Sequence, residues 1–204
     1  MPALIGFDML HYAVMQTDSV SGTTTYSTPK RVVGAVEANI NPNSVSGTLS
    51  GDDGAMETAT ALGEVELNLT VTDAPLEVQA ELLGHKYVNG LLLRGANDVA
   101  PIVAIGGRSL KSNGKYRYFW LLKGQMSQPE QTRKTKQVGS IDFQTFSLSG
   151  SFVRRDSDGL WIIEADEDDS KAAAKIKTWF QSVVTTATLL SETHAEDPKT
   201  KKAE

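Results

Sequence analysis

Side chains able to carry catalysis or bind a metal are few in this chain and far apart. There is no cysteine, and the three histidines are His11, His85 and His194. The missing cysteine excludes thiol nucleophiles, disulfides and Cys-ligated zinc. No HExxH, GxSxG, GxGxxG or GxxxxGK[ST] motif occurs, so zinc hydrolysis, a nucleophile elbow and a phosphate-binding glycine loop all lack their signatures. The sequence predicts no enzyme, metal or cofactor.

Two further kinds of cluster, acidic and aromatic, could take part in chemistry, but each also has a simpler structural interpretation. The acid groups at 52–53, 156–158 and 166–169 could bind calcium or form a glycosidase carboxylate pair, but none fits the calcium-loop pattern, and solvated turns explain them better. The aromatic run Tyr116, Tyr118, Phe119 and Trp120, with basic neighbours, resembles a stacking platform for single-stranded nucleic acid. Packing within a sheet is the favoured interpretation.

Composition bounds the class of protein. The chain has 204 residues, 40% of them hydrophobic, with 20 basic against 25 acidic residues and a formal charge of -5. This length supports one core without disulfides or metal. The acidic balance argues against a dedicated nucleic-acid binder. The N-terminus lacks a basic signal region, and the apolar runs are far shorter than the about 20 residues of a membrane span, so no membrane partner is expected.

Charge is unevenly distributed along the chain. Residues 108–136 hold eight basic residues and one acid, whereas 164–169 hold five acids in six positions. These stretches are either two solvated loops or complementary patches on a subunit that stacks on copies of itself. The candidates for such stacking are Arg108, Lys111, Arg133, Lys134, Lys136, Asp166, Glu167, Asp168 and Asp169.

An apolar period of two dominates the chain and predicts antiparallel strands. The clearest case is 64–71, which places Glu64, Glu66, Asn68 and Thr70 on one face and four aliphatic residues on the other. Other strands are predicted at 8–17, 31–40, 87–94, 101–109, 115–125, 140–153 and 160–165. The strand at 140–153 needs a bulge near 144–145 to keep one apolar face. Turn signals at 112–114 and 156–159 predict hairpins.

Two helices are predicted beside these strands. The first runs from an Asp73 N-cap and Pro75 to a stop at Gly84. The second begins at 168–169 and carries Ile176, Trp179 and Phe180 as its apolar stripe. Residues 183–190 could be frayed helix or a last strand, and 191–204 have a disordered composition. The predicted organisation is therefore a β domain at 1–169, a helical or mixed segment at 170–190 and a disordered tail at 191–204.

Residues 41–63 differ from everything around them. Small and polar residues dominate, and Leu49, Met56 and Leu62 are the only large apolar ones. Long excursions without a core of their own are uncommon inside compact domains. The segment is interpreted as a mobile loop or as an arm completed by a partner.

Six segments in order, 34–43, 52–69, 73–85, 98–106, 109–124 and 152–159, resemble the major tail protein, the tail tube subunit, of long-tailed bacteriophages with non-contractile tails. They fall within 5–169, and residues beyond 169 carry little resemblance. The resemblance implies a mainly β fold with small α content: an antiparallel β-sandwich that forms a barrel with its neighbours, with a flanking short helix and a C-terminal helix. It also implies a virion protein, assembled in the host bacterial cytoplasm.

The same resemblance implies a partner set and a role for particular residues. Six subunits form a ring, and rings stack into a tube that conducts double-stranded DNA without binding it specifically; tape-measure, tail-tip and tail-terminator proteins are the other partners. An acidic lumen would repel phosphates. The lumen candidates are Glu37, Glu64, Glu66, Asn68 and Thr70. The candidates for an inter-subunit arm within 41–63 are Leu49, Asp52, Asp53, Met56 and Glu57.

Two other classes share this strand pattern and stay open. One is the tube subunit of a related contractile injection machine, whose fold is similar. The other is a carbohydrate-binding β-sandwich of a virion, which would be expected to expose aromatic residues in its loops; here the aromatics fall mostly within predicted strands.

Overall fold

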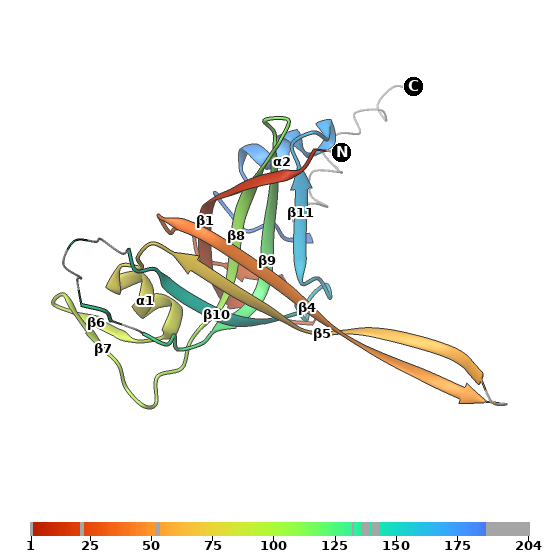
Figure 1. Ribbon diagram of the computed structural model, residues 1–204, viewed down its shortest axis with the longest axis horizontal. Coiled ribbons are helices and arrows are strands. Elements are labelled where there is room, and N and C mark those ends of the chain that lie inside the picture. The colour runs from red at the N-terminus through yellow and green to blue at the C-terminus, as the bar shows by residue number, and fades with distance from the viewer. Residues whose placement is uncertain are drawn as a thin grey trace, which may run out of the picture.

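A large antiparallel sheet organises the protein. A computed structural model describes residues 2–20, 23–51, 54–131, 133–135, 139 and 143–186. The strand order is β2-β1-β8-β9-β10-β5-β4, with β11 paired to β9 and β3 paired to β1; β6 and β7 form a separate small sheet (Figure 1). The fold is mainly β with little helix, as the sequence predicted.

The elements in chain order have the following bounds: β1 Leu4–Thr17, β2 Thr25–Tyr26, β3 Lys30–Arg31, β4 Ala35–Gly51, β5 Gly54–Val71, α1 Leu76–Leu83, β6 Lys86–Val88, β7 Leu91–Leu93, β8 Ile102–Lys111, β9 Tyr116–Met126, β10 Phe146–Val153, β11 Ile162–Asp166, a 3-10 turn Ser170–Ala172 and α2 Ala173–Lys177.

The first core lies where the sheet folds over itself. β4, β5 and β10 cross in front of β1, β8 and β9 (Figure 1). Their apolar side chains meet in one cluster, in which Val65, Leu67 and Phe152 are fully buried. Helix α1 adds Leu82 and Leu83 to this cluster. The described chain without the distal parts of β4 and β5 beyond Asn43 and before Gly63 is called the body below.

A second core covers the opposite face of β8 and β9. Trp120 on β9 packs there with Trp179, Val183 and Val184 from the C-terminal segment. Gly106 on β8 makes room for the indole, because a Cβ at that position would lie 2.5 Å from two ring carbons of Trp120. The Gly106-Gly107 doublet therefore marks close packing across the strand pair.

Polar contacts hold the C-terminal segment onto the sheet. The Trp120 indole donates a 3.1 Å hydrogen bond to the Trp179 carbonyl. Arg155, almost fully buried, donates to the Val184 carbonyl and also to both carboxylate oxygens of Asp158. Thr186 donates to the same carboxylate. Residues 179–186 are thus packed against the β domain.

Several element-level predictions were wrong in detail. The second helix stops at Lys177, so Trp179 and Phe180 lie beyond it, although Asp169 does cap its 3-10 start. Helix α1 has Pro75, not Asp73, at its N-cap. The single strand predicted at 87–94 is the hairpin of β6 and β7, whose turn residues Asn89 and Gly90 both have positive φ.

The segment before β10 also differs from the prediction. β10 begins at Phe146, and Phe143 is 93% exposed in an unpaired segment, so no bulge is needed at 144–145. The loop at 156–159 does not join paired strands, because β10 and β11 both pair with β9 at different positions. The hairpin predicted at 112–114 does join β8 to β9. Residues 187–204 lie outside the described part of the chain.

A two-stranded ribbon projects from the body and is the most conspicuous feature of the outline (Figure 1). It consists of the distal parts of β4 and β5, paired from Ser44 with Leu62 to Gly51 with Gly54. The described residues of 41–63 are therefore strand rather than a structureless loop. The backbone hydrogen bonds of the pairing order this segment although it has no core of its own.

Candidate functional site

The strongest candidate for a functional surface is the outer face of β5 and its two neighbours. On β5, Glu64, Glu66 and Asn68 are exposed and Thr70 is half-buried, while the alternate aliphatic residues are buried in the first core. The alternation predicted from the sequence is therefore confirmed. Strand β5 buries its apolar side chains in the first core and exposes its polar side chains.

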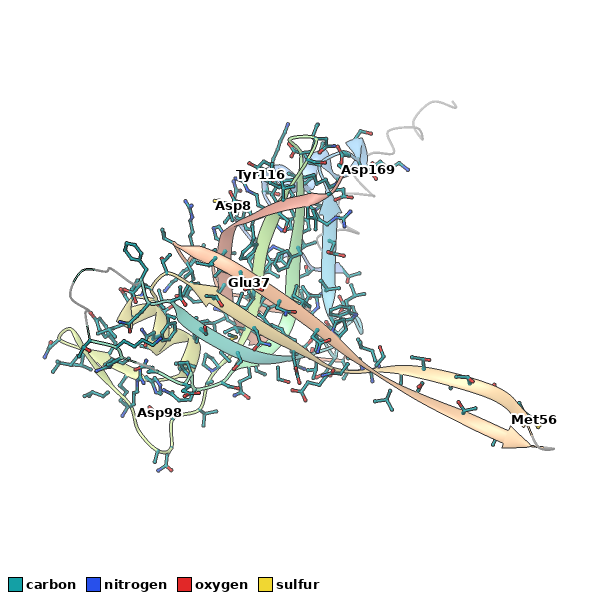
Figure 2. The ribbon with its side chains drawn as sticks, viewed as in Figure 1. Asp8, Glu37, Met56, Asp98, Tyr116 and Asp169 are labelled. Carbon is teal, nitrogen blue, oxygen red and sulfur yellow. The ribbon has the colours of Figure 1, made fainter. Side chains whose placement is uncertain are left out.

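The register extends the polar face across three strands. Asn41 of β4 and Ser151 of β10 flank Glu66, and Asn39 and Ser149 flank Asn68. The third row is Glu37, Thr70 and Ser147. Figure 2 shows Glu37 on this part of the body, well away from the ribbon tip at Met56. This surface, called the polar face, consists of Glu37, Asn39, Asn41, Glu64, Glu66, Asn68, Thr70, Ser147, Ser149 and Ser151.

The charges of the polar face are all of one sign. Glu37, Glu64 and Glu66 are its only ionisable members, and every other member is neutral. Glu37 and Glu66 are each opposite neutral side chains, and no register pair among the described strands joins two of the three glutamates. Such a face repels polyanions and offers no cation to hold them.

Sequence reasoning found five members of this face and missed the other five. The omitted residues are Asn39, Asn41, Ser147, Ser149 and Ser151. The serines alternate with Phe146, Leu148, Gly150 and Phe152, which is the same period-two signal that identified β5. Choosing them required the knowledge that β10 and β4 flank β5, and a single strand's pattern does not contain its neighbours.

The arm candidates lie on the projecting ribbon. Leu49 and Met56 are 64% and 68% exposed, and Glu57 is exposed and directly opposite Leu49. Asp52 and Asp53 lie outside the described residues. No described residue of the body covers these side chains, so their proposed role between subunits stays a prediction.

Most of the stacking candidates have partners within the chain itself. Lys111 Nζ lies 2.8 Å from Asp166 and 2.7 Å from Asp168. Arg117 also binds Asp166, with 2.7 and 2.8 Å hydrogen bonds. Glu167 accepts a hydrogen bond from the Tyr116 backbone N–H. Figure 2 accordingly shows Tyr116 and Asp169 at the same end of the body.

This internal pairing shifts titration at Asp166. The hydrogen bonds from Arg117 hold the pKa of Asp166 well below its usual range; partial burial opposes the shift, and Lys111 adds to it. The basic and acidic stretches therefore neutralise one another at one edge of the body. A contact between stacked copies stays a prediction, and for these residues it must compete with the internal partners.

The remaining stacking candidates are elsewhere. Arg108 makes a two-point contact with Asp8 and lies over the Tyr116 ring at 3.9 Å from its centroid. Arg133 and Lys134 are exposed on the other side of the body, near α1. Lys136 lies outside the described residues.

The two described histidines, His85 and His11, make contacts that hold neighbouring segments together. His85 Nδ1 lies 2.7 Å from Asp98, and its Nε2 lies 2.9 Å from Gln128 Oε1, an arrangement that ties the loop before β8 to the end of α1. His11 stacks on Phe180 under the C-terminal segment. Among the described residues, no three His, Cys, Asp or Glu side chains are grouped closely enough to hold a metal ion. The described helices are all too short or too polar to cross a membrane.

No protein-family model matches this chain, and a search among curated proteins gives no significant match. The polar face, the ribbon and the sequence resemblance described above are therefore the features that bear on function.

Proposed function

We propose that this chain is the tail tube subunit of a long-tailed bacteriophage, a structural protein that polymerises as stacked rings around the path of the genomic DNA. The observation that carries the proposal is the polar face, a surface across three strands that combines carboxylates with small neutral side chains and contains no basic member. A surface that must let DNA pass needs this chemistry.

A channel lining that binds phosphates would slow the passage of DNA. Each Lys or Arg that neutralises a phosphate adds salt-dependent affinity for DNA. A lining of Asn, Ser and Thr is wettable and uncharged, and the three glutamates add repulsion. Repetition of Glu37, Glu64 and Glu66 around a ring would multiply that repulsion, so the duplex would stay hydrated and mobile in the channel.

The sheet edge supports assembly into rings. Among the described strand pairs, β4 pairs with β5 on one side and has no partner on its other side. Exposed edges are aggregation hazards unless they are covered or paired, and closing a sheet into a barrel removes them. In the proposed ring, six subunits join edge to edge with their polar faces toward the lumen.

The ribbon supports stacking of the rings. A two-stranded ribbon with an exposed aliphatic face is marginal by itself in water, and contact with a neighbouring subunit would stabilise it. We therefore assign the ribbon to contacts between copies. Tape-measure, tail-tip and tail-terminator proteins would set the length and the ends of the tube.

Negative-stain electron microscopy of the purified protein over a wide concentration range tests this proposal. Rings with a central channel, and tubes at high concentration or after addition of tail-tip proteins, are expected. A sheath-free tube in tails that contain the protein would separate this reading from the contractile alternative. A protein that stays monomeric under every condition, including co-expression with the other tail proteins, would contradict it.

A further inference from the structure

The two faces of the ribbon differ in chemistry, which indicates how it binds. Residues paired across β4 and β5 share a face. One face carries Val45, Gly47 and Leu49 opposite Ala61, Ala59 and Glu57; the other carries Ser44, Ser46 and Thr48 opposite Leu62, Thr60 and Thr58. These are called the aliphatic face and the hydroxyl face. Val45 is 68% exposed, so the aliphatic face is uncovered in the single chain.

The alternation of polar and apolar side chains on β4 changes phase where the ribbon leaves the body. Within the body, the polar Asn39 and Asn41 alternate with the half-buried Ala38 and Ile40. Beyond the irregularity in pairing between Pro42 and Ser44, the odd-numbered positions are aliphatic and the even-numbered ones are hydroxylic. The aliphatic face therefore continues the side of β4 that faces away from the body's own core, and it must find its partner elsewhere.

A groove at the opposite end of the molecule combines two apolar side chains with polar and charged ones. It lies beside α1, has a volume of about 270 Å³, and is lined in part by Leu76, Phe146, Arg94 and Arg133. Leu76 is 46% exposed. Figure 1 shows α1 at one end of the long axis and the ribbon tip at the other.

The two arginines of this groove have only neutral partners among the described residues. Arg94 donates to Gln79 Oε1 at 3.0 Å, and Arg133 donates to Gln131 Oε1 at 3.4 Å. The carboxylates of Asp73 and Glu130 also line the groove, but no ion pair joins them to either arginine. On the described ribbon, Glu57 is the sole charged residue, and it has no ion pair there.

We infer that the aliphatic face of one copy's ribbon binds the α1 groove of a second copy, with Leu49 against Leu76 and Glu57 facing Arg94 and Arg133. This deepens the proposed function and rests on it. Because the two surfaces lie at opposite ends of the molecule, the contact is head-to-tail and repeats from copy to copy. Opposite charges at the tip and in the groove fix its register.

The size of the ribbon sets the strength of the contact. About eight residue pairs at roughly 3.3 Å per residue give a ribbon about 25 Å long. One face of such a ribbon buries less than the about 1,200 Å² of a typical stable pair. A single contact is therefore weak, and the contacts hold when a ring presents several of them together.

Disulfide trapping tests the inference directly, because the chain has no cysteine of its own. Differently tagged Leu49→Cys and Leu76→Cys subunits are mixed at high concentration under mild oxidation, and covalent heterodimer is measured. Thr48→Cys is the matched control, since it is the adjacent residue on the hydroxyl face. Heterodimer several times more abundant with Leu49→Cys than with Thr48→Cys is expected; equal yields, or none, would overturn the inference.

Charge reversal supplies the second arm. Glu57→Arg is expected to abolish ring stacking, and Arg94→Glu with Arg133→Glu is expected to restore it, whereas Thr58→Arg on the hydroxyl face leaves stacking intact. If the triple variant Glu57→Arg/Arg94→Glu/Arg133→Glu does not recover stacking, the proposed pairing of these charges is also overturned. If the wild-type protein forms tubes but the Leu49→Cys and Leu76→Cys subunits do not cross-link, this inference fails and the proposed function stands. If the link forms but no ring or tube ever does, the proposed function fails and the contact stands.

Discussion

The two halves of β5 show how one strand can serve two environments. From Glu64 to Val71 the aliphatic positions are buried in the first core and the polar positions are exposed. From Gly54 to Leu62 the described side chains are all exposed, and the residues other than Met56, Glu57 and Leu62 are small or hydroxylic. The first half is stabilised by its own chain, whereas the second depends on backbone pairing with β4.

The difference separates the side chains that the chain itself buries from those that it leaves uncovered. The body half buries its aliphatic residues against β4, β10 and α1 of the same chain. The ribbon half retains its aliphatic residues without a partner, and such exposure is typical of surfaces that bind. In the proposed tube, folding and assembly would therefore depend on neighbouring stretches of one strand.

Removing the ribbon should have the largest effect, and should affect assembly alone. Deletion of residues 46–57 leaves Val45 and Ala61 as a register pair joined by three residues, a length that hairpin loops accept. We expect a cooperative thermal transition near that of the wild type and no rings or tubes by electron microscopy. Loss of cooperative melting would show that the ribbon belongs to the folding unit.

Shortening a leucine in each half separates the two roles quantitatively. Leu67 is fully buried, so Leu67→Ala should lower the free energy of unfolding by about 2 to 5 kcal/mol. Leu49→Ala on the ribbon should change it by no more than about 0.5 kcal/mol in the free subunit. Urea denaturation of the monomers measures both. A similar loss in the two variants would contradict the division between body and ribbon.

The sequence revealed the body half more fully than the ribbon half for a physical reason. Alternation in 64–71 is strong because one face is buried, and it correctly predicted which side of β5 is exposed. In 41–63 the aliphatic residues are small and few, so the reversal of phase after Asn43 is faint. It becomes visible only when Val45, Gly47 and Leu49 are compared with the alternate Ser44, Ser46 and Thr48.

Other errors came from interactions distant in sequence. Trp179 and Phe180 have the spacing of a helical stripe, but contacts with Trp120, Tyr118 and His11 place them in a turn against the sheet. The internal partners of Lys111 could not be read from charge counts, because β8 and the end of β11 approach only in the folded sheet. Patterns within a strand and the β8–β9 hairpin were predictable, and pairings between strands distant in sequence were not.

Reversing charge on the polar face should slow DNA passage while leaving the fold intact. The Glu64→Lys/Glu66→Lys variant alters exposed side chains, so tubes should form, but the added cations would bind phosphates. Ejection from phage carrying the variant should be slow or arrested at low salt and recover as salt rises. The matched control, Glu77→Lys/Glu164→Lys, makes the same charge change at exposed positions outside the polar face. Normal ejection in the first variant would remove both glutamates from the lumen.

The smallest expected effect concerns two carboxylates, one paired in the body and one unpaired on the ribbon. Hydrogen bonds from Arg117, opposed by partial burial and aided by Lys111, lower the pKa of Asp166 in the folded protein from the ordinary 3.8. The unfolded state therefore binds the proton more readily, so this pairing stabilises the fold above about pH 4 and is lost as pH falls through the lower folded pKa. Asp166→Asn should cost stability at neutral pH, and its difference from wild type should shrink in acid. Glu57→Gln, which removes a carboxylate without an ion pair among the described residues, is the comparison variant in the same measurement. Urea denaturation of both variants between pH 3 and pH 7 measures this. A pH-independent loss in Asp166→Asn would mean that the side chain acts there through packing and not through its charge.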